Sequence, residues 1–180
     1  MTTTVKTANF RVVPHTMNRI DISTGVPFDE FRAAFEKAAP PFDRESLLRI
    51  VERGGSWDEV LDAAAINAPH SLMVYATIDA TELFSLAGHT TRAVEYLLGN
   101  HTIAETMFRH DPRALLYAPL RVLVYTDGQG NAVFSIDQPT AAFGSLGIEQ
   151  VTKVGRDLDG KVANLLRVIG VDASAAFGQH

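Results

Sequence analysis

LRVLVYTDGQGNAVFSI, residues 120–136, is the stretch that decides the fold. Its two ends, Leu120–Tyr125 and Ala132–Ile136, are rich in β-branched and aromatic residues, and the loop 127–131 between them contains two glycines. Two such runs joined by a short glycine-containing loop are typical of a β-hairpin. We therefore predict two adjacent antiparallel strands at this point of the chain.

Three further segments, all N-terminal to the hairpin, show patterns that favour strands. Met17–Ile22 is expected to end at Ser23-Thr24-Gly25, and Leu72–Ile78 follows the proline at position 69. The third segment, Arg92–Leu98, is ambiguous, because its apolar residues fit both the two-residue period of a strand and the period of a helix.

Helices are predicted between and after these strands. Ser56-Trp57-Asp58-Glu59 has the form of a capping box, and the last helix should end at Gly170. The apolar stripes of the first three helices are Phe28, Phe31 and Phe35; Leu47, Leu48 and Val51; and Val60, Leu61 and Ala64. Strands that arrive partly as a hairpin, with helices among them, indicate an α+β fold with two layers: a small mixed or mainly antiparallel sheet with helices packed on one face.

The length and composition favour one folded domain. The chain has 180 residues, of which 46% are hydrophobic and 21% charged, close to the averages for globular proteins. We expect a single domain over residues 1–180, with a flexible leader at 1–9 and a flexible tail at 171–180.

Composition also excludes several classes of function. Without cysteine the chain has no disulfide, thiolate nucleophile or cysteine metal site, so any metal ligands must be His, Asp or Glu. The net charge is −5 and the 16 Lys and Arg residues are scattered, which argues against nucleic-acid binding. No apolar run suggests a membrane helix or a signal core, so a cytoplasmic protein that binds no membrane is expected.

Several short motifs in the second half resemble the family known as domain of unknown function 302. They are Tyr96-Leu97-Leu98-Gly99-Asn100, Leu116-Tyr117-Ala118-Pro119-Leu120-Arg121-Val122 and Asp137-Gln138-Pro139, in that order within Thr90–Ile169. The resemblance implies a small α+β domain of bacterial origin, often homodimeric, without an established activity, and it favours a strand for Arg92–Leu98. The sequence departs from the family pattern at His101, where proline is usual, and at Thr140, where serine is usual.

His101, Glu105 and His89 are the candidate catalytic residues. On a helix His101 and Glu105 would share a face, so a carboxylate could orient the imidazole or both could reach a metal. The alternative, which we prefer, is that Thr102-Ile103-Ala104-Glu105 is a capping box. Asn100 is expected to cap the helix rather than to help bind an anion. We hypothesise that the helix N-terminus keeps His101 neutral.

The expected ligand pocket lies between the sheet and the helix that starts near Asn100. Its candidate ligand-binding residues are Arg92, Asn100, Tyr96, Met107, Tyr117 and Phe134. Three functions remain open: a homodimeric small-molecule binding module, which we prefer; a histidine-dependent enzyme using His89 or His101 in acid–base, metal or haem chemistry; and a protein-interaction module using a sheet edge or the Ala118-Pro119 face. The sequence specifies neither a metal nor a cofactor.

Overall fold

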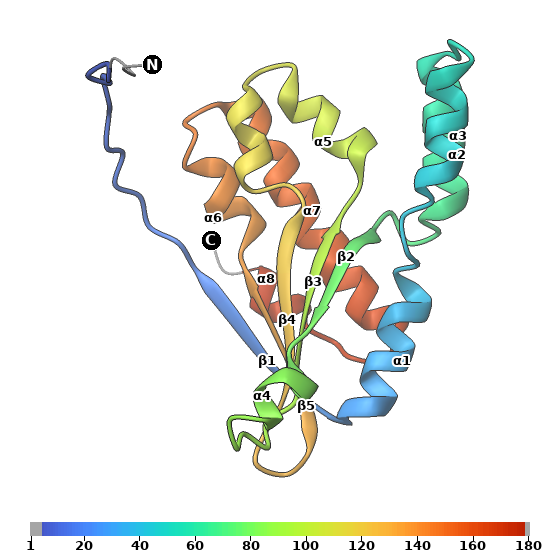
Figure 1. Ribbon diagram of the computed structural model, residues 1–180, viewed down its shortest axis with the longest axis vertical. Coiled ribbons are helices and arrows are strands. Elements are labelled where there is room, and N and C mark those ends of the chain that lie inside the picture. Colours follow the sequence, from blue (N-terminus) through green and yellow to red (C-terminus); the bar gives the residue numbers. More distant parts are fainter. Residues whose placement is uncertain (1–4, 179–180) are drawn as a thin grey trace.

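The computed structural model describes residues 5–178, which form a five-stranded antiparallel sheet with helices (Figure 1). The strands run in the order β1-β5-β4-β3-β2, and every neighbouring pair is antiparallel. They are β1 (Arg19–Pro27), β2 (Met73–Asp79), β3 (Ala93–Gly99), β4 (Leu120–Thr126) and β5 (Asn131–Asp137). The predicted α+β class is confirmed, and of the two predicted kinds of sheet the antiparallel one is found.

The predicted hairpin is confirmed as β4 and β5, which pair from Val122↔Ile136 to Thr126↔Ala132. The Asp127 side chain closes the turn by accepting the backbone N–H groups of Gln129 and Asn131 at 2.8 and 2.9 Å. The ambiguous segment Arg92–Leu98 is a strand, because β3 pairs with β2 on one side and β4 on the other.

Strand β1 is longer than predicted. We expected it to end at Ser23-Thr24-Gly25, but it continues to Pro27 and pairs again with Asn131 after a shift in register. Gly25 has a φ of 68°, and the Thr24 hydroxyl donates to the carbonyl of Ala132 at 2.7 Å. The glycine therefore allows an irregularity within the strand, in the manner of a β-bulge, instead of terminating it.

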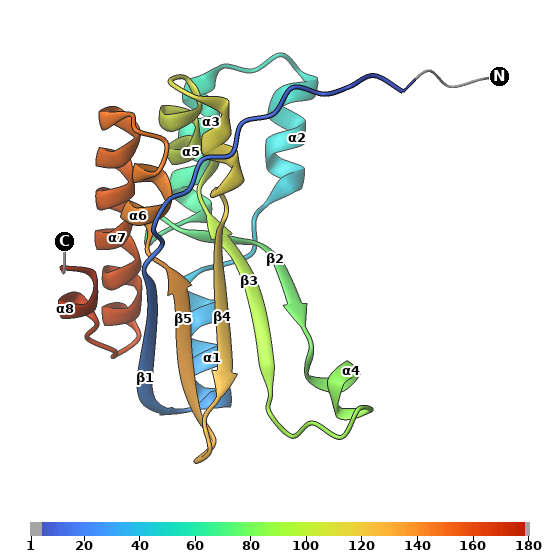
Figure 2. The ribbon, with the colours of Figure 1, turned by 90° about the vertical axis from the view of Figure 1, so that its left-hand side faces the viewer.

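Helices α1 (Phe28–Ala38) and α7 (Glu149–Val168) contribute to the apolar core on one face of the sheet. Figure 2 shows α1 behind the strands. The predicted stripe Phe28, Phe31 and Phe35 is buried, and Phe35 lies 5.0 Å from Tyr96 between ring centroids. The remaining helical segments are α2 (Arg44–Glu52), α3 (Trp57–Asn67), α4 (Thr81–Ser85), α5 (His101–Phe108), the 3₁₀ helix η1 (Pro112–Leu116), α6 (Pro139–Gly144) and α8 (Ser174–Phe177).

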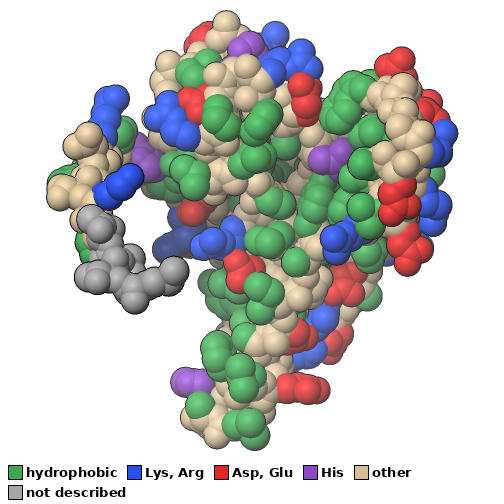
Figure 3. Space-filling model, turned by 45° about the horizontal axis from the view of Figure 1, so that its top comes forward, with side chains coloured by type: hydrophobic (Ala, Val, Ile, Leu, Met, Phe, Trp, Pro, Cys, Tyr) green, Lys and Arg blue, Asp and Glu red, His purple; other side chains and the backbone are tan. Residues whose placement is uncertain are grey.

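Helices α2 and α3 form a hairpin that stands at one side of the molecule (Figure 1), and α3 contacts α5 and packs against β2. A hollow lies between the outer part of the hairpin and the neighbouring helices (Figure 3). The predicted capping box of Ser56 and Glu59 is present. The predicted stripe of α2 is wrong in part, because Leu48 and Val51 are exposed whereas Ile50 is buried. Leu61, predicted to lie inward on α3, is also largely exposed. A two-helix unit at the edge of a domain buries a narrower face than a helix lying on the sheet.

The two ends of the described chain differ in how they pack against the domain. Residues 5–18 form no helix or strand, and part of the predicted leader, residues 1–4, lies outside the described residues. The predicted flexible tail is not found at 171–178, because Val171, Ala173 and Phe177 are buried against the core. Within residues 5–178, no helix has the length and apolar character needed to cross a membrane.

Candidate functional site

His101, the first residue of α5, is held by Tyr75 of β2. The backbone N–H of His101 donates to the Tyr75 hydroxyl oxygen at 2.8 Å, and the same oxygen lies 2.8 Å from Nδ1 of the His101 ring. Among residues 5–178, the Tyr75 hydroxyl proton has no acceptor within reach other than Nδ1. We therefore assign Nδ1 as the acceptor, which places the proton of the neutral imidazole on Nε2.

Aromatic packing partly buries this pair. The ring of Phe42 stacks on Tyr75 at a centroid distance of 4.7 Å and meets His101 at 5.6 Å with an interplanar angle of 62°. Burial raises the pKa of Tyr75 to about 12 and lowers the pKa of His101 below its ordinary 6.5. Nε2 of His101 is buried and has no hydrogen-bond partner within residues 5–178. The direction agrees with the predicted neutral imidazole, but the cause is burial rather than the helix dipole.

Asn100 caps α5. Its Oδ1 accepts the backbone N–H of Thr102 at 2.9 Å and the Thr102 hydroxyl at 2.7 Å, while its Nδ2 donates to the carbonyl of Ser71 at 3.0 Å. Since Tyr75 accepts the N–H of His101, the first two backbone donors of the helix are already satisfied. This arrangement favours the predicted cap over the anion-binding alternative.

Glu105 plays neither of its predicted roles in this structure. The capping box at Thr102-Ile103-Ala104-Glu105 is wrong, because the helix starts earlier and Asn100 is its N-cap. The Glu105 carboxylate pairs with Arg109 one turn further along α5. His101 hydrogen-bonds with Tyr75 instead, so the expected His101–Glu105 couple is absent from the described structure.

A cavity of about 200 Å³ lies beside His101, where α5 and η1 cover the end of the sheet. Tyr75, Asn100 and His101 form part of its wall, and the predicted residue Met107 also lines it. The other lining residues are Gly99, Ile103, Ala104, Leu115, Ala118, Pro119, Leu120, Phe143 and Leu158. Within residues 5–178, the lining includes no Asp, Glu, Lys or Arg. The cavity is therefore suited to an uncharged, mainly apolar ligand.

Three residues predicted to line the pocket lie elsewhere. Tyr96 and Phe134 are fully buried in the core beneath α1, where the Tyr96 hydroxyl donates to Glu36 at 2.8 Å. Tyr117 packs on Phe143, and its hydroxyl lies 3.3 Å from both Ser145 Oγ and His15 Nε2. In β3 the two-residue period of the apolar residues matches the observed burial, but it did not distinguish the core from the cavity wall.

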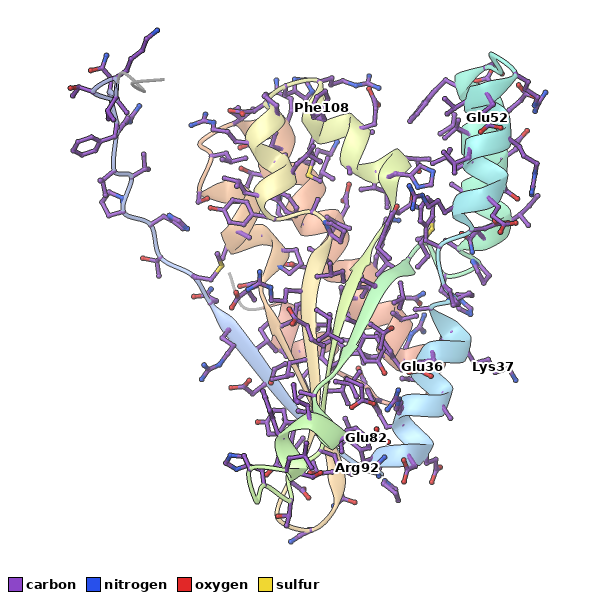
Figure 4. All side chains as sticks on the ribbon, viewed as in Figure 1. Glu36, Lys37, Glu52, Glu82, Arg92 and Phe108 are labelled. Atoms are coloured by element: carbon purple, nitrogen blue, oxygen red, sulfur yellow. The ribbon has the colours of Figure 1, made fainter. Side chains whose placement is uncertain are left out.

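Arg92 and His89 lie at the other end of β3 from His101. Arg92 makes a bidentate ion pair with Asp29, at 2.8 and 2.6 Å, and its guanidinium lies 4.4 Å from the centre of the Phe28 ring. His89 precedes the same strand end. Figure 4 shows Arg92 far from Phe108, the last residue of α5. Seven strand residues span roughly 23 Å, so the predicted grouping of His89 and Arg92 with Asn100 and His101 is wrong.

Tyr75 and Phe42 are the site residues that sequence reasoning missed. Tyr75 belonged to a predicted strand, but only the pairing Met73↔Gly99 places its strand beside the start of α5. Phe42 is brought to the site by the isolated bridge between Pro41 and Val74. In the described part of the chain, no three His, Asp or Glu side chains gather as metal ligands would.

The architecture and the site define a small α+β domain with an apolar cavity and, at its wall, a partly buried histidine. Residues 51–168 match the model of the family described as "Domain of unknown function DUF302", and the chain belongs to this family. The match begins well before Thr90, where the predicted resemblance started, and therefore includes α3 and β2 as well.

A solved structure supports the fold. The chain is similar to the crystal structure of an uncharacterized conserved protein DUF302 from Bacillus stearothermophilus, with a TM-score of 0.57 and 17% sequence identity. The similarity covers 85% of this chain and 97% of that one. No curated protein matches the chain.

Proposed function

We propose that this protein is a homodimeric module of the bacterial cytoplasm that binds a small, uncharged, mainly apolar molecule in the cavity beside α5. The cavity is the observation that carries the binding proposal. Within this proposal, the bacterial origin and the homodimer rest on the family resemblance, and the cytoplasmic location rests on the sequence, in which no apolar run suggests a membrane helix or a signal core.

The size and lining of the cavity limit the ligand. An apolar cavity of about 150 Å³ is large enough to bind benzene, so about 200 Å³ admits one aromatic ring with a short substituent or a small bicyclic ring. A charged ligand would lose its hydration without gaining an ion pair, because the lining offers no opposite charge within the described chain. For about ten non-hydrogen atoms, roughly −0.5 kcal/mol per atom corresponds to a Kd of about 0.2 mM.

Isothermal titration calorimetry and thermal denaturation with matched probes test this proposal. Indole and toluene are expected to bind and to raise the Tm, whereas benzoate, which adds a charge to a similar ring, is not. Ala104→Phe should fill the cavity and abolish indole binding, since Ala104 is part of the lining. Ala65→Phe, at an exposed position on α3, is the matched control and should bind indole like the wild type. If none of the probes binds, or if Ala104→Phe binds indole normally, the proposal is wrong.

A histidine-dependent enzyme is the second candidate, favoured by the neutral imidazole that Tyr75 orients at the cavity wall. Acid–base chemistry suits this site better than haem, because even drug-sized ligands occupy pockets of about 300–1,000 Å³. Diethyl pyrocarbonate, which acylates accessible neutral imidazoles, tests the candidate by mass spectrometry. Modification of His101 that indole suppresses would support it, and a fully inert His101 would argue against it.

A further inference from the structure

We propose that the N-terminal arm of one chain, residues 5–18, docks on the α2–α3 hairpin, residues 43–67, of a second copy. The inference rests on the homodimer proposed above and gives it a mode of assembly. It does not depend on the ligand of the cavity.

The arm presents apolar side chains without a partner surface. Val5, Phe10 and Val12 are 90%, 88% and 78% exposed. Phe10 and Val12 are two residues apart, so in an extended segment they point to the same side. Beyond its own neighbours, the arm's described side-chain contacts are those of His15 with Tyr117 and of Asn18 with Gln138, both in its second half. Several large apolar side chains in one exposed segment indicate a surface that becomes covered.

The α2–α3 hairpin presents apolar side chains of its own. Leu48 and Val51 of α2 and Trp57, Leu61 and Ile66 of α3 are all exposed. Figure 3 shows hydrophobic side chains on the hairpin along the hollow between its outer part and the neighbouring helices. An extended segment with alternating apolar residues can cover such a surface.

Charge complementarity identifies the occupant. The arm contains Lys6 and Arg11 and no acidic residue. The hairpin contains six acidic residues and three arginines. Among residues 5–178, neither Lys6 nor Arg11 has an acidic partner within ion-pair distance, and the hairpin residues Glu52, Asp58 and Asp62 have no basic one. Arg44 of the hairpin is also without an acidic partner in this range, but six acidic residues and three arginines give the hairpin a net charge of −3, whereas the arm carries +2. The two surfaces are therefore opposite in net charge.

The positions of the two surfaces favour a second copy over the same chain. In Figure 1 the arm leaves β1 on one side of the molecule, and the hairpin stands on the other side, with α5, α6 and α7 between them. Fourteen extended residues reach roughly 46 Å, which is sufficient to span to a neighbouring molecule. Reciprocal docking of two arms on two hairpins gives a closed dimer with two-fold symmetry.

Light scattering coupled to size-exclusion chromatography tests the arm's role. The full chain is expected to have the mass of a dimer, and both deletion of residues 1–13 and the double variant Phe10→Ser/Val12→Ser should have the mass of a monomer. Leu83→Ser/Leu86→Ser, which removes two exposed leucines near α4, is the matched control and should remain dimeric. Circular dichroism of each variant confirms that the domain is folded.

A charge exchange tests the partner surface. Lys6→Glu/Arg11→Glu places negative charge on the arm, and Glu52→Lys/Asp58→Lys places positive charge on the hairpin. Each variant alone should be monomeric, whereas their mixture should form a heterodimer, since both arm–hairpin contacts then join opposite charges. A monomeric full-length chain at about 100 µM, well above the Kd of a stable dimer, overturns both the homodimer and this inference. A dimer that survives deletion of the arm, or a mixture that stays monomeric, overturns this inference alone.

Discussion

At the scale of the residue, the Tyr75 hydroxyl has two functions at once. It accepts the backbone N–H of His101 and donates to Nδ1 of the same residue, so one oxygen both satisfies a helix N-terminus and fixes a tautomer. The buried Nε2 is left as the one free polar atom of the ring. A change at Tyr75 should therefore affect both stability and the ionisation of His101.

Tyr75→Phe is expected to reduce the free energy of unfolding by about 1–3 kcal/mol. The substitution keeps the ring that stacks on Phe42 but leaves the N–H of His101 and its Nδ1 without their partner. Urea denaturation followed by circular dichroism measures the loss. Tyr125→Phe, whose hydroxyl has no hydrogen-bond partner recorded in the described chain, is the control and should change stability by less than about 0.5 kcal/mol. Equal losses in the two variants would contradict the role assigned to Tyr75.

His101 should make the stability of the protein depend on pH. Burial lowers its pKa in the folded state below the ordinary 6.5, so the unfolded state binds the proton more tightly. The stability it contributes is complete above pH 6.5 and is lost as the pH falls toward the folded pKa, by at most about 1.4 kcal/mol per pH unit.

Urea denaturation between pH 5 and pH 8 tests this dependence. The difference in unfolding free energy between the wild type and His101→Gln should shrink as the pH falls through this range. His110→Gln, which removes an exposed histidine, should keep the wild-type dependence. A difference between wild type and His101→Gln that is constant with pH would show that burial does not perturb this imidazole.

At the scale of the element, a buried carboxylate joins α6 to α7. Asp159 of α7 is buried and accepts hydrogen bonds from the backbone N–H and the hydroxyl of Thr140, at 3.1 and 2.5 Å, and from the Gln138 amide at 3.1 Å. The helices approach so closely that a Cβ on Gly155 would lie 3.1 Å from the carbonyl oxygen of Pro139. Serine, which is usual at position 140 in the family pattern, has a hydroxyl as threonine does. In this chain that hydroxyl holds α6 to α7 through its hydrogen bond to Asp159.

Asp159→Ala should destabilise the protein by about 2–4 kcal/mol, because one buried and two partly buried donors lose their acceptor. Thr140→Ser should retain most of the stability, since it keeps the hydroxyl that bonds to Asp159. Asp157→Ala removes an exposed carboxylate of the same helix and serves as the control. Chemical denaturation of the three variants measures these losses of unfolding free energy. A loss below about 0.5 kcal/mol for Asp159→Ala would show that the Asp159 carboxylate does not stabilise the contact between α6 and α7.

The elements that depend on local chemistry were predictable from sequence, and those that depend on register were not. The hairpin loop at Asp127, the phenylalanine stripe of α1 and the cap at Ser56 each involve residues within a few positions of one another. The contact of Tyr75 with His101 instead requires β2 to pair with β3 in one particular register. Glu105 was misassigned because Thr102 and Asn100 are both acceptable caps by type, and only the backbone shows which one is used.

At the scale of the whole molecule, the segment after α7 completes the core. Val171, Ala173 and Phe177 belong to the main apolar cluster, and Phe177 is 4% exposed. The chain reverses at Gly170, whose φ is 88°, and α8 then packs back on α7. This segment lies beyond residue 168, where the family match ends.

Phe177→Ala should lower the free energy of unfolding by about 3 kcal/mol, because removing a buried aromatic ring costs its transfer free energy and leaves a cavity. Val168→Ala, at a half-exposed position on the last turn of α7, is the control and should cost less than about 1 kcal/mol. Limited proteolysis gives an independent measurement: the wild type should resist cleavage within residues 171–178, and Phe177→Ala should be cut there. If both variants cost the same and the wild type is cut readily, the segment is the flexible tail that its composition suggests, and the core ends at α7.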